Sequence, residues 1–577
     1  MKMAKIGIYL DSLATARIHQ HHANVFQLYI QELMTFAGIP FRSFDSADKM
    51  DAGDFDVVIA ALTGGMESES SLWDFAERGG IVISFAGLPY LAARLGCRQL
   101  QEVPVGYASL SGEPGGGRPM RYFRARPWLH TSSDAGSLAL SCEEDGMVRV
   151  GAADGAVAGP LLQTFRVGKG IIARWAVDIP TLIVRLQQGE LPVYEDGIPA
   201  QDGSGALTEG ILKADDQCQL DWEADRTHTA TGMPYYEHPY ADYWREAFMH
   251  QLLSAASASD LIVPFVDYWP AGVEAVAMIS HDSDFNSDDA GRTTLEVLSE
   301  CGVRSTWCMI EPGYSPELYP MIREAGHELA LHYNALEIEQ GIWSQEEFNR
   351  QASWFKKATG LPAATSNKNH YTRFEGWGEL FRWCEEAGIQ SDQTRGPSKK
   401  GNVGFPFCTS HPYFPIAWAD EYNRLYDVLE IGFLTQDLMH PALSDTSVIA
   451  PFLEKVMEVR GVAHFLYHQK HIHELPEVRK ALVTTASEAK KLGFEFWTGA
   501  EINDWVRAKR ELRIIGLGEG GRLRVEGERT AIAAYRPLLA GESSDGAVKR
   551  FGLPCVLLQV EFGGASQQQS VALSSLQ

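Results

Sequence analysis

The N-terminal segment has no long apolar run, and no segment with helical periodicity carries a run of lysine and arginine. Only a few apolar residues precede Asp11, too few for the core of a signal peptide or for a bilayer span. We therefore expect a cytoplasmic protein without membrane insertion. The formal net charge of −25 makes nucleic acids and anionic membranes poor partners, whereas neutral or cationic ligands suit it better.

Paired cysteines are also missing. No two cysteines form a Cys-x-x-Cys motif, and the eight that are present are scattered along the chain. This distribution favours buried thiols in a reducing compartment over a disulfide framework. The cysteines are Cys97, Cys142, Cys218, Cys301, Cys308, Cys384, Cys408 and Cys555.

The apolar content is sufficient for several domains. With 577 residues, of which 45% are hydrophobic and 22% charged, the chain is too long for one core and ordinary in composition for folded domains. We expect an α/β class of fold in four parts. These are an α/β domain at 1–190, a connector and packing segment at 191–270, a (β/α) barrel at 271–508, and a small β domain with a tail at 509–577.

The first part alternates strands with helices, which indicates a parallel α/β layer. Its β-rich runs are 5–10, 57–62 and 81–85, and its helical stretches are 24–36 and 71–78. Together with the later stretch 159–189, it resembles the class I glutamine amidotransferase-like fold. An enzyme of that fold needs a nucleophilic cysteine on a tight turn after a strand. The turn in ISFAGLPY has none, so we expect this domain to be non-catalytic.

Three histidines lie close together in this part, at His19, His21 and His22. They precede a helical stretch and have no evident carboxylate or thiol partner. We interpret them as a solvated loop and not as a metal site.

The segments on either side of the expected barrel are different in character. Residues 190–231 are rich in Gly, Asp and Gln and lack periodicity, as a connector does, whereas 233–248 are crowded with aromatic residues, as in a helix that packs between domains. After Glu511, apolar and polar residues alternate between glycine-rich turns, which predicts a small β domain. The last residues, GGASQQQSVALSSLQ, indicate a loose tail.

From Val273 to Arg507, β-rich runs and amphipathic helical stretches repeat. This repetition favours a full or partial (β/α) barrel, whose active site lies at the C-terminal ends of the strands. Asp282 and Asp284 directly follow one β-rich run and His332 ends another, while His370 comes after the next helical stretch. The polar residues thus fall where an active site is expected.

A pair of carboxylates at the end of an apolar strand is costly to bury unless a cation or a proton shares the site. A loop stabilised by local Asx turns would explain Asp-Ser-Asp by itself. The recurrence of polar strand ends favours a metal site instead, because two histidines, one carboxylate and a water form an ordinary catalytic zinc shell.

Six motifs follow one another in this region, and together they resemble those of the NodB-type polysaccharide deacetylases, the family four carbohydrate esterases. The closest likeness is to a subgroup with an Asp-x-Asp first motif. The motifs are SHDSDF (280–285), AGHELALHYN (325–334), KNHYTRF (368–374), EEAGIQSDQT (385–394), GFPFCTSHPY (404–413) and AHFLYHQKHI (463–472).

The resemblance implies roles for individual residues. Asp282 matches the catalytic base and His468 the general acid. Asp284 and His332 match metal ligands. The expected cofactor is a divalent metal, Zn²⁺ first, although cobalt, nickel and manganese suit the same ligands.

The chain departs from the family pattern at two positions. Most members carry a second histidine four residues after the first, where this chain has Leu336, and the resemblance to the subgroup implies His370 as the replacement ligand. Lys368 stands where the third motif usually has an arginine, which keeps the charge but loses the bidentate fork that would orient the base. Asp392 and Tyr413 match positions that shape the pocket, and a backbone N–H near Tyr413 is expected at the oxyanion site.

The resemblance implies a hydrolase that removes an N- or O-acetyl group from a sugar-containing substrate. Two alternatives stay open. One is a catalytically impaired carbohydrate-binding or scaffold protein, motivated by Leu336 and Lys368, and the other hydrolyses a different C–N bond or a glycosidic bond on the same barrel. Assembly into a homo-oligomer also stays open. Candidates for a sugar-stacking platform, for which core packing is an equal explanation, are Trp307, Trp377, Trp383 and Trp418.

Overall fold

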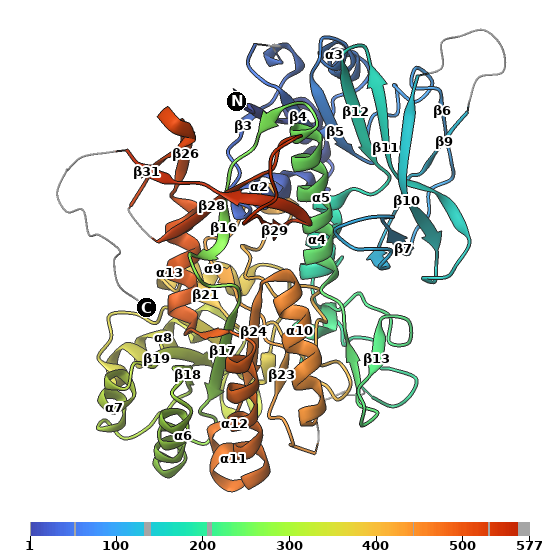
Figure 1. The fold of residues 1–577 in the computed structure, drawn as a ribbon. Coiled ribbons are helices and arrows are strands. Elements are labelled where there is room, and N and C mark those ends of the chain that lie inside the picture. The colour runs from blue at the N-terminus through green and yellow to red at the C-terminus, as the bar shows by residue number, and fades with distance from the viewer. Residues whose placement is uncertain are drawn as a thin grey trace.

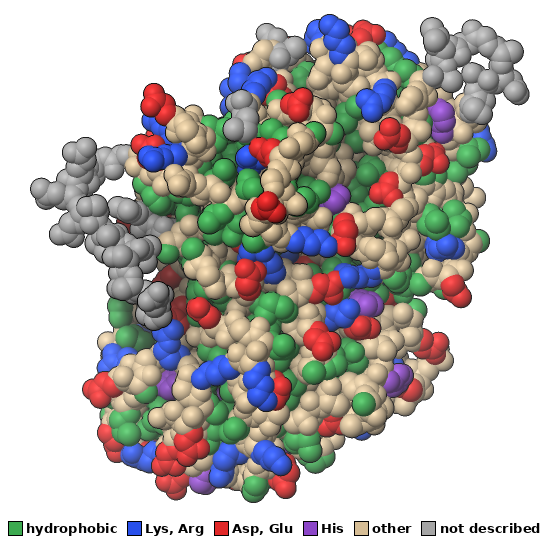
Figure 2. All heavy atoms as spheres, viewed as in Figure 1, with side chains coloured by type: hydrophobic (Ala, Val, Ile, Leu, Met, Phe, Trp, Pro, Cys, Tyr) green, Lys and Arg blue, Asp and Glu red, His purple; other side chains and the backbone are tan. Residues whose placement is uncertain are grey.

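The computed structural model describes residues 2–50, 53–131, 140–204, 210–441, 443–528 and 531–563. Two large sheets lie at opposite ends of the molecule, and the long helix α5 (Tyr240–Ser257) packs beside α4 (Ile179–Gln188) at their junction (Figure 1). None of the described helices is long and apolar enough to cross a membrane. On the face drawn in Figure 2, acidic and basic side chains are interspersed.

The N-terminal sheet has nine strands in the order β3-β2-β4-β5-β12-β11-β10-β7-β8. The ladders from β3 to β12 are parallel and those from β12 to β8 are antiparallel, so the sheet is mixed where the sequence pattern indicated a parallel layer. The reason is local, because β11 and β12 are joined by a two-residue turn, which permits only an antiparallel pair. The strands are β2 (Ile6–Leu10), β3 (Arg42–Phe44), β4 (Val57–Leu62), β5 (Ile81–Phe85), β7 (Gly106–Ser109), β8 (Met120–Tyr122), β10 (Cys142–Val150), β11 (Val157–Val167) and β12 (Gly170–Trp175).

Helices α1 (Ser12–Gln20), α2 (Ile30–Phe36) and α3 (Met66–Glu77) connect the parallel strands of this sheet. Directly after β5, Ala86 has a φ of 51°, in the left-handed region, and turns lead from there to β6 (Cys97–Gln99). That this part is amidotransferase-like and non-catalytic stays a prediction.

The second sheet is parallel throughout, in the order β22-β21-β20-β19-β18-β17-β24-β23, with β25 paired to the start of β17. Within the described residues no ladder joins β22 to β23, so the barrel expected from the sequence is open at that point. Its strands are β17 (Val276–Asp282), β18 (Thr306–Met309), β19 (Glu328–Tyr333), β20 (Ser366–Asn369), β21 (Ser391–Asp392), β22 (Leu429–Glu430), β23 (Thr435–Gln436), β24 (Val462–Leu466) and β25 (Glu495–Phe496).

Helices alternate with these strands and cover the outside of the sheet (Figure 1). Each helix buries one face, because its apolar side chains recur at helical spacing. In α10 (Ile449–Val459), for example, Phe452, Leu453 and Val456 are fully buried. The helices are α6 (Asp288–Cys301), α7 (Leu318–Glu324), α8 (Gln345–Thr359), α9 (Glu379–Ala387), α10 (Ile449–Val459), α11 (Gln469–Glu474), α12 (Pro476–Lys491) and α13 (Gly499–Arg510).

The C-terminal strands form two small sheets, one of which crosses the expected boundary at 270. Strand β16 (Phe265–Pro270) pairs with β28, so the connector contributes an edge to the C-terminal part. The remaining strands are β26 (Arg513–Leu517), β27 (Leu523–Glu526), β28 (Ile532–Pro537), β29 (Val548–Arg550), β30 (Leu553–Leu557) and β31 (Val560–Phe562). The tail expected from the sequence, 564–577, lies outside the described residues.

Short strand pairs complete the fold. They are β1 (Lys2–Met3) with β15 (Leu261–Ile262), β6 (Cys97–Gln99) with β9 (Trp128–His130), and β13 (Arg226–His228) with β14 (Pro234–Tyr236). One buried apolar cluster runs through both large sheets, α5 and the C-terminal strands. All eight cysteines are free thiols.

Candidate metal centre

The parallel strands of the second sheet bring polar side chains together at one edge. Asp282 is the last residue of β17, and Asp284 follows two residues later. His332 lies in β19, His370 directly follows β20, and His468 lies two residues beyond β24. Because all these strands run in the same direction, their carboxyl ends meet, and the five residues predicted from the sequence lie in one cluster.

Three of these residues form a triangle of ligand atoms. Oδ1 of Asp284 lies 3.2 Å from Nε2 of His332 and 3.3 Å from Nδ1 of His370. The two imidazole nitrogens are themselves 3.2 Å apart. Ligand atoms at about 2.1 Å around a tetrahedral zinc ion are about 3.4 Å from one another. The triangle therefore has the size that such an ion needs.

The other nitrogen of each imidazole has a partner that decides where its proton sits. Nδ1 of His332 lies 3.0 Å from the carbonyl oxygen of Lys368, which can only accept, so Nδ1 carries the proton. Nε2 of His370 lies 3.3 Å from Oε2 of Glu339, and a carboxylate likewise holds the proton on that side. In the neutral rings, both lone pairs then face Oδ1 of Asp284, an arrangement that a cation stabilises.

The carboxylate at the centre of this triangle has the properties of a ligand. Oδ1 of Asp284 is buried and accepts no hydrogen bond from the described residues. Burial favours the neutral acid, but the positive charge of His468 and the two neighbouring imidazoles hold the pKa of Asp284 well below its usual range. The three residues thus fit a divalent metal with two imidazoles and one carboxylate, and Leu336, which is buried, supplies no donor.

Asp282 lies beside the triangle and is held by a buried lysine. Nζ of Lys368 is 3.3 Å from Oδ1 of Asp282 and donates to Oγ of Ser280 at 2.5 Å. Ser280 also contacts Nε2 of His464 at 2.7 Å, so its hydroxyl links the lysine to a buried imidazole. The side chain of Lys368 is fully buried, and the charge contact expected of the usual arginine is kept.

His468 also lies beside the triangle, with Nε2 4.0 Å from Oδ2 of Asp282. Its Nε2 lies 3.4 Å from Oδ2 of Asp284, and its Nδ1 lies 2.5 Å from Oδ2 of Asp437. Burial lowers the pKa of His468, but the negative charges of Asp437 and Asp284 outweigh it and raise the pKa to about 10. His471 shares the same oxygen of Asp437, with Nδ1 at 2.8 Å. His468 therefore carries a proton that faces the ligands.

The structure places the two other predicted pocket residues elsewhere. Asp392 is fully buried, accepts hydrogen bonds from Asn367 and Thr394, and makes no described contact with the five clustered residues. Tyr413 packs against the N-terminal part, where its hydroxyl donates to the carbonyl of Gln187. Its N–H donates to the carbonyl of Glu430 at 3.1 Å and is therefore not free for an oxyanion. Asp392 is buried inside its own part of the fold, whereas Tyr413 packs against the N-terminal part. The sequence motifs do not reveal either arrangement.

Sequence reasoning missed Asp437 and Glu339, the carboxylates that position His468 and His370. Glu339 ends the short 3-10 helix η4 (Glu337–Glu339), and Asp437 follows β23. Neither belongs to one of the six motifs, and only the position of each near a histidine in space gives it a role. The suggested tryptophan platform is mostly core, because Trp307, Trp377 and Trp383 are at most 8% exposed. The exposed rings beside the ligands are instead Phe285 and Tyr371, at 61% and 48%.

The fold and these side chains define a mixed α/β protein whose parallel sheet carries a candidate metal centre at its carboxyl edge. No protein-family model and no curated protein matches the sequence. Solved structures resemble part of it. One is a Mycobacterium smegmatis protein provisionally named a polysaccharide deacetylase, with 16% identity over 42% of this chain and 94% of that one and a TM-score of 0.33.

Two further structures show similar values. The allantoinase PuuE has 13% identity over 42% of this chain and 93% of its own, with a TM-score of 0.31. A protein from Pseudomonas aeruginosa PAO1, also provisionally named a polysaccharide deacetylase, has 12% identity over 42% and 93%, with a TM-score of 0.30. Because each TM-score is below 0.5, these structures do not define the chemistry of this chain.

Proposed function

We propose that this chain is a metal-dependent hydrolase that removes an N- or O-acetyl group from a sugar-containing substrate. The observation that carries the proposal is the triangle of Asp284, His332 and His370, with a carboxylate, Asp282, and an imidazole, His468, beside it. A divalent cation held by these three residues, Zn²⁺ in the first place, would polarise the acetyl carbonyl and lower the pKa of a bound water toward about 7.

Asp282 acts as the base in this proposal. Its Oδ2 lies 3.7 Å from Nε2 of His332, on the side of the ligands, where it can take a proton from the attacking water. Lys368 holds the other oxygen, Oδ1, at 3.3 Å. The lysine is thus a positioning residue for the base.

His468 acts as the acid. Asp437 holds Nδ1 and leaves Nε2 facing the ligands, where it can donate a proton to the leaving amine or alcohol. The pKa of about 10 reflects two neighbouring carboxylates, and a cation at Asp284 would cancel part of that negative charge. The pKa of His468 then moves closer to neutral pH, where a general acid is most effective.

Two exposed aromatic rings support a sugar-containing substrate. Phe285 directly follows Asp284, and Tyr371 directly follows His370, so each ring lies next to a ligand in the chain. Phe285 is 61% exposed and Tyr371 is 48% exposed, although both side chains are aromatic. A flat ring beside a polar site suits a pyranose, which has C–H groups on its faces and hydroxyls at its rim.

The two alternatives involve the same residues. An impaired, carbohydrate-binding protein is motivated by Leu336 and Lys368, but His370 offers the third donor and Lys368 still reaches Asp282, which supports an active site. Hydrolysis of another C–N bond or of a glycosidic bond would use the same cluster, so only a substrate panel separates it.

The test measures bound metal and acetate release on the full chain with acetylated chitooligosaccharides and acetylated xylan. We expect about one zinc per chain. Asp282→Asn should keep the metal and lose at least about 100-fold in turnover, whereas Asp284→Asn should lose both. Asp289→Asn, an exposed carboxylate near the start of α6, is the matched control. Absence of metal, or cleavage of non-acetyl amides only, contradicts the proposal.

A further inference from the structure

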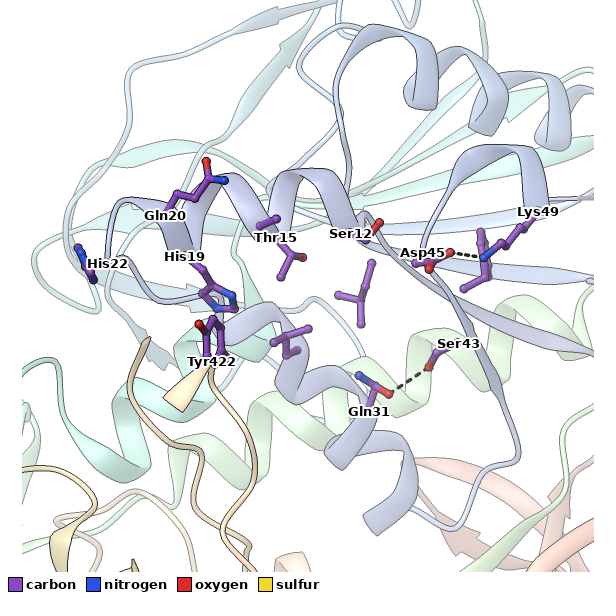
Figure 3. Close-up of a pocket in the computed structure, with 14 residues that line it drawn as sticks. Ser12, Thr15, His19, Gln20, His22, Gln31, Ser43, Asp45, Lys49 and Tyr422 are labelled. Atoms are coloured by element: carbon purple, nitrogen blue, oxygen red, sulfur yellow. Dashed lines mark hydrogen bonds and ion pairs between the residues drawn. The ribbon is translucent and has the colours of Figure 1, made fainter. Parts of the chain in front are cut away.

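A second hollow lies on the N-terminal sheet and shares no residue with the candidate metal centre (Figure 3). Its volume is about 850 Å³, within the range of about 300–1,000 Å³ that is usual for ligand pockets. In Figure 3, His19 and Tyr422 lie at one end, and the ion pair of Asp45 with Lys49 lies at the other. Strand β3, helix α1 and the start of α2 supply most of its lining.

The position of the hollow in the sheet is that of a ligand site. Leu10 and Ser12 stand at the carboxyl end of β2, and Asp45 follows the carboxyl end of β3. The chain leaves β2 for β3 on one side and later returns to β4 on the other side of β2. In open α/β sheets, ligands bind at the carboxyl ends of the strands beside such a switch in strand order.

One wall of the hollow is the aromatic ring of Tyr422, which comes about 400 residues later in the chain than the rest of the lining. Tyr422 is 71% exposed, and its ring meets that of His19 edge-on at 5.5 Å between centroids. Tyr422 and Asn423 both have left-handed backbones, with φ of 55° and 52°, a conformation that asparagine adopts readily but that costs about 1–2 kcal/mol for tyrosine. The chain thus accepts backbone strain at the place where this ring is exposed.

Hydrogen bonds of Asn423 hold the segment that carries the neighbouring ring of Tyr422. Its side-chain oxygen accepts from the N–H of Val25 at 2.8 Å and from Nε2 of His19 at 2.9 Å. Its side-chain nitrogen donates to Asn24 and to the carbonyl of Ala417, both at 2.9 Å. Asn423 is only 3% exposed, so Tyr422 is an exposed ring on a well-anchored loop.

The charges around the hollow are balanced, which favours a neutral ligand. Nζ of Lys49 is paired with Oδ1 of Asp45 at 2.6 Å, so the two charges cancel. The positive end of α1 is already capped, because Oδ1 of Asp11 accepts from the N–H of Ala14 at 2.7 Å. The remaining lining combines apolar side chains, such as Leu28, with hydroxyl and amide groups, such as Ser12.

We infer that this hollow is a second, non-catalytic binding site for a neutral saccharide, with Tyr422 as the ring on which a pyranose stacks. A sugar matches the lining because it offers apolar faces to Tyr422 and Leu28 and hydroxyls to the polar groups around them. The site is independent of turnover at the metal residues. It would hold a glycan chain to the protein at a place other than the point of hydrolysis.

The test titrates the full chain with N,N′,N″-triacetylchitotriose and with xylotriose by calorimetry. Asp284→Asn is the starting protein, because it removes the metal ligand and with it any turnover. We expect at least one of the trisaccharides to bind this variant. Adding Tyr422→Ala should weaken binding at least about tenfold, and Tyr422→Phe should keep it, because the stacking ring is retained.

Two controls make the result specific. Tyr194→Ala removes a tyrosine that is equally exposed, at 71%, but does not line the hollow, and should leave binding unchanged. Ala16→Trp places an indole in the hollow from the surface of α1 and should block binding without disturbing the core. Circular dichroism and thermal unfolding confirm that each variant folds.

Three outcomes would overturn the inference. They are no binding of either trisaccharide at about 10 mM, equal binding with and without Tyr422→Ala, and binding seen only when Asp284 is intact. The last outcome places the sugar at the metal residues. Failure of the proposed hydrolysis appears separately, as absent acetate release by the wild-type chain, and does not affect these titrations.

Discussion

His332 and Lys368 are direct cross-strand neighbours in the parallel pair β19 and β20, and Nδ1 of His332 donates to the carbonyl of Lys368 at 3.0 Å. The backbone carbonyl of Lys368 thereby orients the imidazole of His332, and the side chain of Lys368 reaches Asp282. One position in β20 therefore contacts both the proposed metal ligand His332 and the proposed base Asp282.

Replacing His370 by alanine should remove the third ligand. We expect metal affinity to fall at least about 100-fold, and Glu339→Gln, which loses an outer partner, to cost about 10-fold to 100-fold. Competition with a coloured chelator measures both. His473→Ala is the matched control, because that histidine bonds Thr293 on the surface. Wild-type affinity in His370→Ala would show that the ligand set is different.

Lys368→Met should leave a buried carboxylate without its partner. We expect a loss of about 3–5 kcal/mol in the free energy of unfolding and a lower kcat at unchanged metal content, because Asp282 would no longer be held in place. Lys368→Arg keeps the charge but adds volume at a fully buried site, at about 1–3 kcal/mol. Urea unfolding, metal content and kcat separate the two variants, and an unchanged kcat in Lys368→Met would contradict the positioning role.

Asp437→Asn should lower the pKa of His468. The folded-state pKa of about 10 is above the unfolded value of about 6.5, so the stabilising contribution is fully present below pH 6.5 and is lost as the pH rises through 10. We expect the variant to lose that contribution and its alkaline rate limb to move to lower pH. His471→Asn leaves the Asp437 contact with His468 intact and should shift the limb less. Identical limbs in all three proteins would exclude His468 as the acid.

Metal affinity should fall as the pH is lowered. Burial lowers the pKa of His370, but the charges of Asp284 and Glu339 outweigh it and raise the pKa, so protons compete with the metal at that nitrogen. We expect the apparent Kd to increase about tenfold for each pH unit below the histidine pKa. Chelator competition from pH 5 to pH 8 measures this, and a flat profile would mean that no histidine binds the metal.

Asp267 joins three parts of the chain. Oδ2 of Asp267 accepts from Arg460, at 2.8 Å, and from Arg550, at 3.0 Å, and the side chain is nearly buried. Asp267→Asn should cost about 3 kcal/mol, because it removes the buried one of the two carboxylates, Asp267 and Glu274, that both guanidinium groups share. Asp54→Asn, which breaks an exposed pair with Arg42, should cost less than about 1 kcal/mol. Equal unfolding curves for the two variants would mean that Asp267 does not hold these parts together.

The sequence by itself was sufficient for most of the local elements and for the placement of polar residues at the strand ends. Apolar runs such as 57–62 form strands because their side chains are buried on both faces of a sheet, and this requirement is written in the run itself. The parallel repetition of strand and helix also brings Asp282, Asp284, His332 and His370 to one edge, because parallel strands share a carboxyl end.

The tertiary structure alone decided which partners these residues have. Asp437 and Glu339 each lie 31 residues before the histidine that they contact, His468 and His370. Tyr413 lies away from the site because it contacts Gln187. Strand β16 joins the C-terminal sheet, and Tyr422 closes a hollow against α1 some 400 residues earlier. Such contacts depend on how whole sheets pack, a long-range property that no local pattern of apolar and polar residues encodes.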